Sequence, residues 1–167
     1  INDASAAENT VIATVPVGTN PEGIAFDSAN NRMYVANQDD DTVSVINTTT
    51  NAVDATISVG TNPDGIAFDS ANNRMYVANA VANTVSVINT ATNAVDATIS
   101  VGTTPSGIAF DSANNRMYVP NYSDDTVSVI NTTTNAVDAT ISVGDGPRAI
   151  AFDSANNRMY VPNYSDD

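Results

Sequence analysis

The sequence repeats itself with a period of 42 residues over nearly its whole length. The segment GIAFDSANNRMYV begins at Gly23, Gly65 and Gly107, and it recurs as AIAFDSANNRMYV from Ala149. Only about the first nine of the 167 residues lie outside this pattern. A chain of this kind is expected to fold as a series of similar units that bury their apolar surfaces against one another.

Each period contains four short runs of β-branched and aromatic residues. In the second period these runs are 65–68, 74–78, 84–88 and 94–101, and Asn, Asp, Gly and Pro residues separate them. Four antiparallel strands in about 40 residues are typical of a β-propeller blade, with a β-solenoid as the alternative. We therefore predict an all-β fold, a β-propeller or propeller segment built of 42-residue four-stranded antiparallel blades.

The composition excludes several kinds of chemistry. The chain has 19 acidic and 5 basic residues, a formal net charge of −14, and no Cys, His, Lys or Trp. Without Cys and His it can form neither a Cys/His zinc site nor a Ser-His-Asp triad. Its negative charge repels nucleic acids and anionic lipids, so we expect no nucleic-acid partner. No apolar run approaches the roughly 20 residues of a membrane-spanning helix, so we expect no membrane span.

The second run of each period carries a motif. It reads Tyr-Val-Ala-Asn from Tyr34 and Tyr76, and Tyr-Val-Pro-Asn from Tyr118 and Tyr160. Gly-x-x-Pro-x-Gly precedes the first run, and the third run reads Thr-Val-Ser-Val-Ile-Asn. With these flanks the sequence resembles the YVTN-repeat β-propellers, which include surface-layer proteins of methanogenic archaea. The resemblance implies a propeller that is often exported or displayed on the cell envelope, and it implies no shared activity.

Both ends of the sequence fall within incomplete periods. Residues 11–18 align with 53–60, so a fourth strand follows the N-terminal extension, whereas the C-terminal period stops after a second strand. A ring-closing blade would then lack its third strand. The chain is part of a longer one, or copies join by lending strands, or a four-bladed ring closes irregularly. The predicted domains are an extension over 1–9 and a propeller over 10–167, with an outer strand over 10–18, blades over 23–60, 65–102 and 107–144, and a partial blade over 149–167.

The copies differ mainly in two loops of each period. The loop between the second and third strands starts with Gln, Ala, Tyr and Tyr in successive copies, and the loop before the first strand ends with Glu, Asp, Ser and Arg. In an antiparallel meander both loops lie at one end of the strands, so this face is the candidate binding surface, unless it merely tolerates drift. The candidate binding residues are Gln38, Asp39, Asp40, Asp41, Tyr122, Asp124, Asp125, Arg148 and Tyr164.

These candidates have functional and structural interpretations. Tyr122 and Tyr164 can stack on a sugar, anchor a partner protein or pack locally. Arg148, the one basic residue outside the repeated hairpin, can bind a ligand or pair with nearby acids. Ca²⁺ prefers carboxylate oxygens, so the acidic loops could bind this ion. The alternative is that they are solvated polar loops without a bound ion. The candidate Ca²⁺ ligands are Asp39, Asp41, Asp124 and Asp125, and no other cofactor is expected.

Two further patterns recur along the chain. Asp27 and Arg32 flank the first turn of their period, as do their equivalents in every copy, and we interpret them as a turn cap and an ion pair across the hairpin. Asn-x-Ser/Thr sequons provide candidate glycosylation sites. These sites are Asn47, Asn121, Asn131 and Asn163.

Together these features favour an extracellular or cell-surface structural or interaction module rather than an enzyme. The rigid scaffold would present variable loops on one face and could assemble through open strand edges. We expect a homo-oligomer or polymer, or a part of a longer chain. The alternatives are a propeller that binds a glycan or protein, with or without Ca²⁺, and a fragment of a propeller hydrolase or lactonase-like enzyme.

Overall fold

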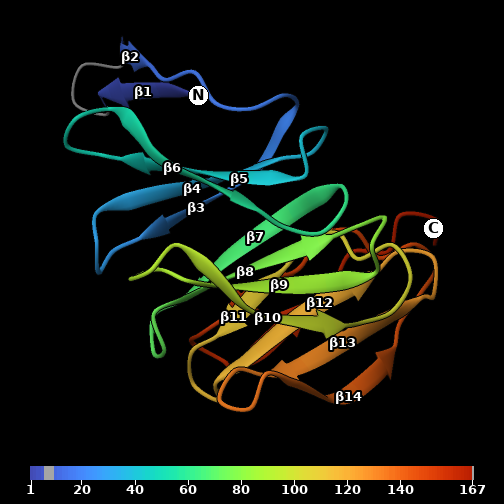
Figure 1. Cartoon of the computed structure of the whole chain (residues 1–167). Helices are drawn as coiled ribbons and strands as arrows, with labels where there is room; N and C mark the ends of the chain where they lie inside the picture. The colour runs from blue at the N-terminus through green and yellow to red at the C-terminus, as the bar shows by residue number, and fades with distance from the viewer. Residues whose placement is uncertain (6–9, 167) are drawn as a thin grey trace.

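Strands form all the regular secondary structure in the part of the chain that the computed structural model describes, residues 1–5 and 10–166. Three four-stranded antiparallel sheets follow one another along the chain, and each corresponds to one sequence repeat (Figure 1). Within each sheet the strands follow one another in chain order. The prediction of an all-β propeller segment built of four-stranded blades is confirmed.

The strands divide into three complete blades and two flanking hairpins. The first blade contains β3 (Pro21–Asp27), β4 (Arg32–Asn37), β5 (Thr42–Asn47) and β6 (Ala52–Ser58). The second contains β7 (Pro63–Asp69), β8 (Arg74–Asn79), β9 (Thr84–Asn89) and β10 (Ala94–Ser100), and the third contains β11 (Ala109–Asp111), β12 (Arg116–Asn121), β13 (Thr126–Asn131) and β14 (Ala136–Ser142). The flanking hairpins are β1 (Asn2–Ser5) with β2 (Thr10–Thr14), and β15 (Ala151–Asp153) with β16 (Arg158–Tyr160).

The turn between the first and second strands is held by the aspartate that the repeat places there. In the first blade, Asp27 Oδ1 accepts hydrogen bonds from the backbone N–H groups of Ala29 and Asn30, and Asp27 Oδ2 accepts one from Asn30 Nδ2. Asn31 then adopts a φ of 52°, a conformation that Asn tolerates better than most residues. The predicted turn cap is therefore present.

The ion pair predicted across this hairpin is wrong, because the arginine pairs with a different aspartate. Arg74 Nη2 lies 2.9 Å from Asp96 Oδ2 on the fourth strand, and it forms no ion pair with Asp69 among the described residues. Asp69 is fully buried, and its oxygens accept the hydrogen bonds of the turn. The carboxylate on the fourth strand is the one that lies at the surface, where the guanidinium can reach it. The equivalent pairs are Arg32–Asp54 at 3.8 Å and Arg116–Asp138 at 2.9 Å.

The core lies between neighbouring blades. The apolar residues of the first blade and those of the second form one buried cluster, so neither blade buries its facing side alone. The second and third blades share a second cluster built from equivalent positions. The cluster between the first two blades contains Tyr34, Val43, Val45, Ile57, Ile66, Met75, Val77 and Ile88.

A tyrosine hydroxyl joins each of these blade pairs. Tyr34 Oη donates to Asn93 Oδ1 at 3.1 Å, and Tyr76 Oη donates to Asn135 Oδ1 at 2.7 Å. Each bond runs from the second strand of one blade to the turn between the third and fourth strands of the next. Burial, more than the charges nearby, raises the pKa of both phenols, so the hydroxyl groups remain protonated donors.

Strand β1 is a third strand that the sequence analysis missed. Asn2 lies opposite Thr14 and Ala4 lies opposite Val11, with a bulge between Asp3 and Ala4. One period later, β5 pairs with β6 in the same register and with a bulge at the equivalent step. The expectation that no third strand accompanies the N-terminal fourth strand is thus wrong. The Asn-Asp-Ala-Ser sequence lacks the β-branched residues by which the other third strands were predicted.

We predict that the hydroxyl of Tyr76 contributes about 1 kcal/mol to stability through Asn135. Tyr76→Phe should lower the free energy of unfolding by this amount in urea titrations followed by circular dichroism. Asn135→Gly provides the matched background, because it removes the acceptor while glycine tolerates the φ of 54° at this position. In that background Tyr76→Phe should have a much smaller effect, and equal effects in both backgrounds would contradict the prediction.

Candidate functional site

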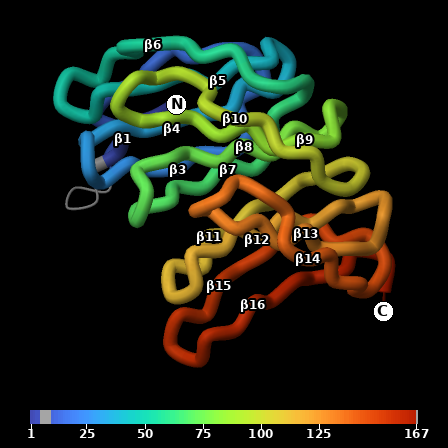
Figure 2. The backbone as a smooth tube through the Cα atoms, turned by 60° about the horizontal axis from the view of Figure 1, so that its bottom comes forward, coloured from blue at the N-terminus to red at the C-terminus, as the bar shows by residue number. Residues whose placement is uncertain are grey.

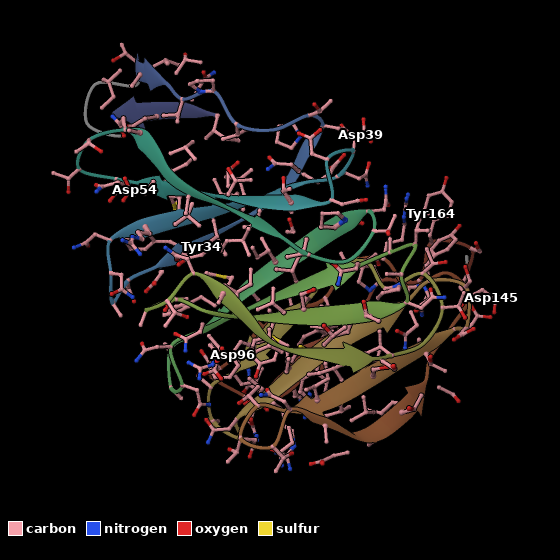
Figure 3. All side chains as sticks on the ribbon, viewed as in Figure 1. Tyr34, Asp39, Asp54, Asp96, Asp145 and Tyr164 are labelled. Carbon is pink, nitrogen blue, oxygen red and sulfur yellow. The ribbon has the colours of Figure 1, made fainter. Side chains whose placement is uncertain are left out.

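The two variable loops of each repeat lie side by side. The N–H of Gln38 donates to the carbonyl oxygen of Asn20 at 2.9 Å, and Asn20 Nδ2 donates to Gln38 Oε1 at 2.7 Å. The equivalent backbone bond recurs in the later repeats. Figure 3 shows Asp39, Asp145 and Tyr164 on one side of the molecule, away from Asp54 and Asp96. We call this surface the loop face, and it comprises residues 19–22, 38–41, 61–64, 80–83, 103–106, 122–125, 145–148 and 164–166.

A pocket of about 400 Å³ opens among these loops. Its lining comes from three repeat positions, and the copies differ at each of them. The first position of the loop between the second and third strands contributes from every copy, and two positions of the loop before the first strand contribute from several copies. The lining residues of this loop-face pocket are Gln38, Asn62, Asp64, Ala80, Thr104, Ser106, Tyr122, Arg148 and Tyr164.

The guanidinium of Arg148 lies between two aromatic rings. Its Cζ is 5.4 Å from the ring centroid of Tyr122 and 5.7 Å from that of Tyr164. Both distances are within the range of a cation–π interaction, so the two rings orient the cation. Tyr164 is 73% exposed, which leaves much of its surface open to a ligand. Three of the residues predicted from the sequence thus form one cluster.

Asp64 places a carboxyl group in the same pocket. Burial raises its pKa most, the carboxylate of Glu22 raises it further, and the cation of Arg148 opposes both effects. Glu22, Asp64, Ser106 and Arg148 occupy the same repeat position. From the first copy to the last, the formal charge at this position therefore changes from negative to positive. A ligand at this site would meet groups of opposite charge.

The backbone that carries Arg148 is fixed by its neighbours. The N–H of Gly107 donates to the carbonyl oxygen of Arg148 at 2.8 Å, and so does Ser106 Oγ, also at 2.8 Å. One repeat earlier, Gly65 bonds to Ser106 in the same way. A Cβ atom on Gly65 or Gly107 would collide with these carbonyl oxygens, so the close approach requires glycine. The segments that begin adjacent repeats thus hold the pocket residues in place.

The acidic residues of the loops bind backbone N–H groups. Asp40 Oδ2 accepts from Thr19 and Asp124 Oδ2 accepts from Thr103, both at 2.6 Å. Asp125 Oδ1 accepts from Gly146 at 2.9 Å. Asp41 makes the equivalent bond in the first repeat and Asn83, an uncharged residue, makes it in the second. These bonds need an oxygen acceptor rather than a negative charge.

The Ca²⁺ prediction for Asp39, Asp41, Asp124 and Asp125 gains no support from this geometry. Within residues 1–5 and 10–166, no three or more side chains of His, Cys, Asp or Glu are grouped so as to hold a metal ion. Asp39 lies exposed on the loop face. Ca²⁺ binding therefore remains a prediction from the sequence.

The candidate glycosylation sites differ in access. Asn121 is fully buried, and its Nδ2 donates to Thr126 and Ser128, so an enzyme cannot reach this amide in the folded chain. Asn47 and Asn131 accept turn N–H groups through Oδ1 and lie partly exposed. Asn163 is the equivalent of Asn121 in the flanking hairpin and is partly exposed. The last three sites remain predictions.

Sequence reasoning missed part of the pocket. The lining residues that were not among the candidates are Asn62, Asp64, Ala80, Thr104 and Ser106. The available signal was that the copies differ at these positions, which is the same signal that pointed to Arg148. The burial of Asp64 could not be read from the sequence, because it arises from loops of other repeats.

Comparison with known proteins places the chain among β-propellers. A family model described as YNCE-like β-propeller matches residues 6–111. The chain is similar to a solved chain of Kuenenia stuttgartiensis hydrazine synthase, with a TM-score of 0.81 and 21% identity. The match covers 93% of this chain and 46% of that one, so this chain spans about half the length of its structural relative. At this identity the likeness shows the fold alone.

Two other comparisons are negative. The search among curated proteins gives no match. Among the described residues, no helix is long and apolar enough to span a bilayer.

We predict that Asp64→Asn stabilises the protein at neutral pH but not in acid. Because the pKa of Asp64 is raised in the folded state, the stability linked to its proton is complete below the usual value of 3.8 and is lost as the pH rises through the folded value. Asparagine keeps this position neutral at every pH. In urea titrations, Asp64→Asn should therefore unfold at a higher urea concentration than wild type at pH 7, and the difference should shrink at pH 3.

Asp39→Asn is the control for this experiment, since Asp39 is an exposed carboxylate of the same face. It should leave the pH dependence of unfolding nearly unchanged. An Asp64→Asn effect of the same size at pH 3 and pH 7 would show that ionisation of Asp64 is not its cause.

Proposed function

The chain belongs to the YNCE-like β-propeller family, and from that premise we propose that it is a non-catalytic interaction module of the cell surface. Its blades form a rigid scaffold, and its loop-face pocket binds a ligand. The acidic composition and the sequons support a location outside the cell. The lack of His, Cys and Lys supports binding rather than catalysis.

One observation carries the proposal, namely that the copies differ where they line the pocket. The residues between blades are repeated almost without change, whereas Gln38, Ala80, Tyr122 and Tyr164 occupy a single repeat position and meet in one pocket. A purely structural repeat has no need of three different residues at that position. A binding site does, because an asymmetric ligand needs different contacts from each copy.

The chemistry of the lining favours a glycan. Tyr164 offers an exposed aromatic face on which a sugar ring can stack, and Arg148 offers guanidinium N–H donors. Asn62 and Thr104 add amide and hydroxyl groups that can exchange hydrogen bonds with sugar hydroxyls. An acidic substituent of the ligand would lie toward Arg148 and away from Asp64. A protein partner that inserts a polar side chain is the alternative.

Binding to a glycan array tests this proposal. We predict that the full chain binds a defined subset of glycans, and that Tyr164→Ala or Arg148→Ala weakens this binding about tenfold, because each removes one member of the cation–π cluster. Titration calorimetry with the best glycan gives the dissociation constants.

Val81→Ser is the matched control, since Val81 lies on the same face, is 66% exposed and does not line the pocket. It should bind as wild type does. If the wild-type chain binds no glycan, or if the two pocket variants bind as tightly as Val81→Ser, the proposal of a glycan site in this pocket is wrong.

A further inference from the structure

We infer that the loop-face pocket takes an acidic sugar, whose carboxylate or sulfate group pairs with Arg148, and that binding of this anion is coupled to protonation of Asp64. The inference rests on the proposed function, because it names the class of glycan that the same pocket binds. It adds a requirement for negative charge on the ligand and a dependence of the affinity on pH.

Arg148 is a cation without a carboxylate partner. The arginines of the three complete blades, Arg32, Arg74 and Arg116, each lie 2.9–3.8 Å from a carboxylate oxygen of an aspartate. In the part of the chain that the structure describes, Arg148 forms no ion pair of this kind, and the rings of Tyr122 and Tyr164 flank it instead. The rings do not neutralise the positive charge, so a ligand anion can do so.

The arrangement of the repeats explains why Asp64 does not pair with this cation. The first strands β3, β7, β11 and β15 lie side by side (Figure 2). The N–H of Gly65 donates to the carbonyl oxygen of Ser106 at 3.1 Å. The N–H of Gly107 donates to that of Arg148 at 2.8 Å. Ser106 therefore lies between Asp64 and Arg148, and the acid and the cation line the same pocket without an ion pair.

Asp64 provides the one carboxyl group among the described residues that line the pocket. Burial raises its pKa most, the carboxylate of Glu22 raises it further, and the cation of Arg148 lowers it. The phenols of Tyr122 and Tyr164 are the other titratable groups of the lining. The remaining acids of the loop face, at positions 39–41, 124, 125, 145 and 166, lie outside the lining. When Asp64 is ionised, it repels an anion that approaches Arg148.

Protonation of Asp64 favours the bound anion. It removes the repulsion between two negative groups and converts the carboxylate into an O–H donor. A bound anion in turn raises the pKa of Asp64 further, so the proton and the ligand each strengthen the binding of the other. Because the pKa of Asp64 already lies above 3.8, affinity for the acidic sugar should rise as the pH falls through the folded-state value. It should fall again only where the acid group of the ligand becomes protonated.

The charge of the whole chain sharpens this selection. The formal net charge of −14 repels anions in general, but salt screens that repulsion beyond about 8 Å at physiological ionic strength. A sugar gains from its charge only by placing it directly against the guanidinium, where hydrogen bonds between ions are stronger than those between neutral groups. The flanking rings restrict the guanidinium before the ligand arrives, which lowers the entropy lost on binding.

Matched oligosaccharides test the requirement for negative charge. The probes are oligosaccharides that end in a uronic acid, the same oligosaccharides with the carboxylate reduced to a hydroxymethyl group, and these neutral forms with a sulfate ester added. In titration calorimetry the full chain should bind at least one acidic form about tenfold more tightly than its neutral counterpart. Arg148→Gln should bind both forms alike, whereas Val81→Ser, the control outside the pocket, should keep the preference.

Calorimetry at two pH values tests the role of Asp64. Wild type should bind the preferred acidic probe more tightly at pH 5 than at pH 7. Titrations in two buffers that differ in ionisation enthalpy should show that protons are taken up on binding at pH 5. Asp64→Asn should bind the probe more tightly than wild type at pH 7 and lose most of the proton uptake. Asp39→Asn, which alters an exposed carboxylate outside the lining, should keep both properties of wild type.

The failure of this inference differs from the failure of the proposed function. Equal affinity of wild type for acidic and neutral forms, or an Arg148→Gln variant that keeps the preference, would overturn the inference and leave a glycan site in place. No binding to any probe would overturn both. Tighter binding of a glutamate peptide than of any sugar would overturn the choice of ligand. Proton uptake that persists in Asp64→Asn, or none in wild type, would overturn the role of Asp64.

Discussion

Each blade depends on its neighbours, because a four-stranded sheet cannot cover its own faces. Ile57 and Ile99 are 5% and 6% exposed, since a further blade packs against each of them. The equivalent Ile141 is 46% exposed, because only the β15–β16 hairpin follows the third blade. The same side chain is therefore core or surface according to what lies beside it. This dependence makes the packing of successive blades against one another the main source of stability.

The same dependence explains where the copies can differ. A residue between blades meets an equivalent set of neighbours in every repeat, so a change that fits one interface fits the others, and the repeat stays uniform. The loop face is free of this constraint because its side chains project beyond the blade interfaces. Gln38, Ala80 and Tyr122 can differ there without altering the cores. The pocket residues can therefore vary while the scaffold remains constant.

The limits of sequence prediction follow from the range of the interactions. The 42-residue period and the β-branched runs predicted the blades, because strand formation and turn capping depend on residues close together in the chain. Strand β1 was missed because Asn2–Ser5 becomes a strand only by pairing with β2. The ion pair of Arg74 with Asp96 depends on a register across two strands, and the burial of Asp64 depends on loops of other repeats. These distant contacts leave no local pattern to read.

The excess of carboxylates has a structural origin. This origin bears on the role of Arg148, the single basic residue of the loop face. Asp27 and Asp40 accept backbone N–H groups in the folded chain, so an acidic composition need not indicate a metal or a cationic partner. Asn83 serves as well as Asp41 in the equivalent bond, which shows that geometry rather than charge selects these residues. Arg148 has no such structural duty in the repeat, since its equivalents are Glu, Asp and Ser. A cation held between two tyrosines at a position that the scaffold leaves free is therefore the group on which the proposed glycan site most depends.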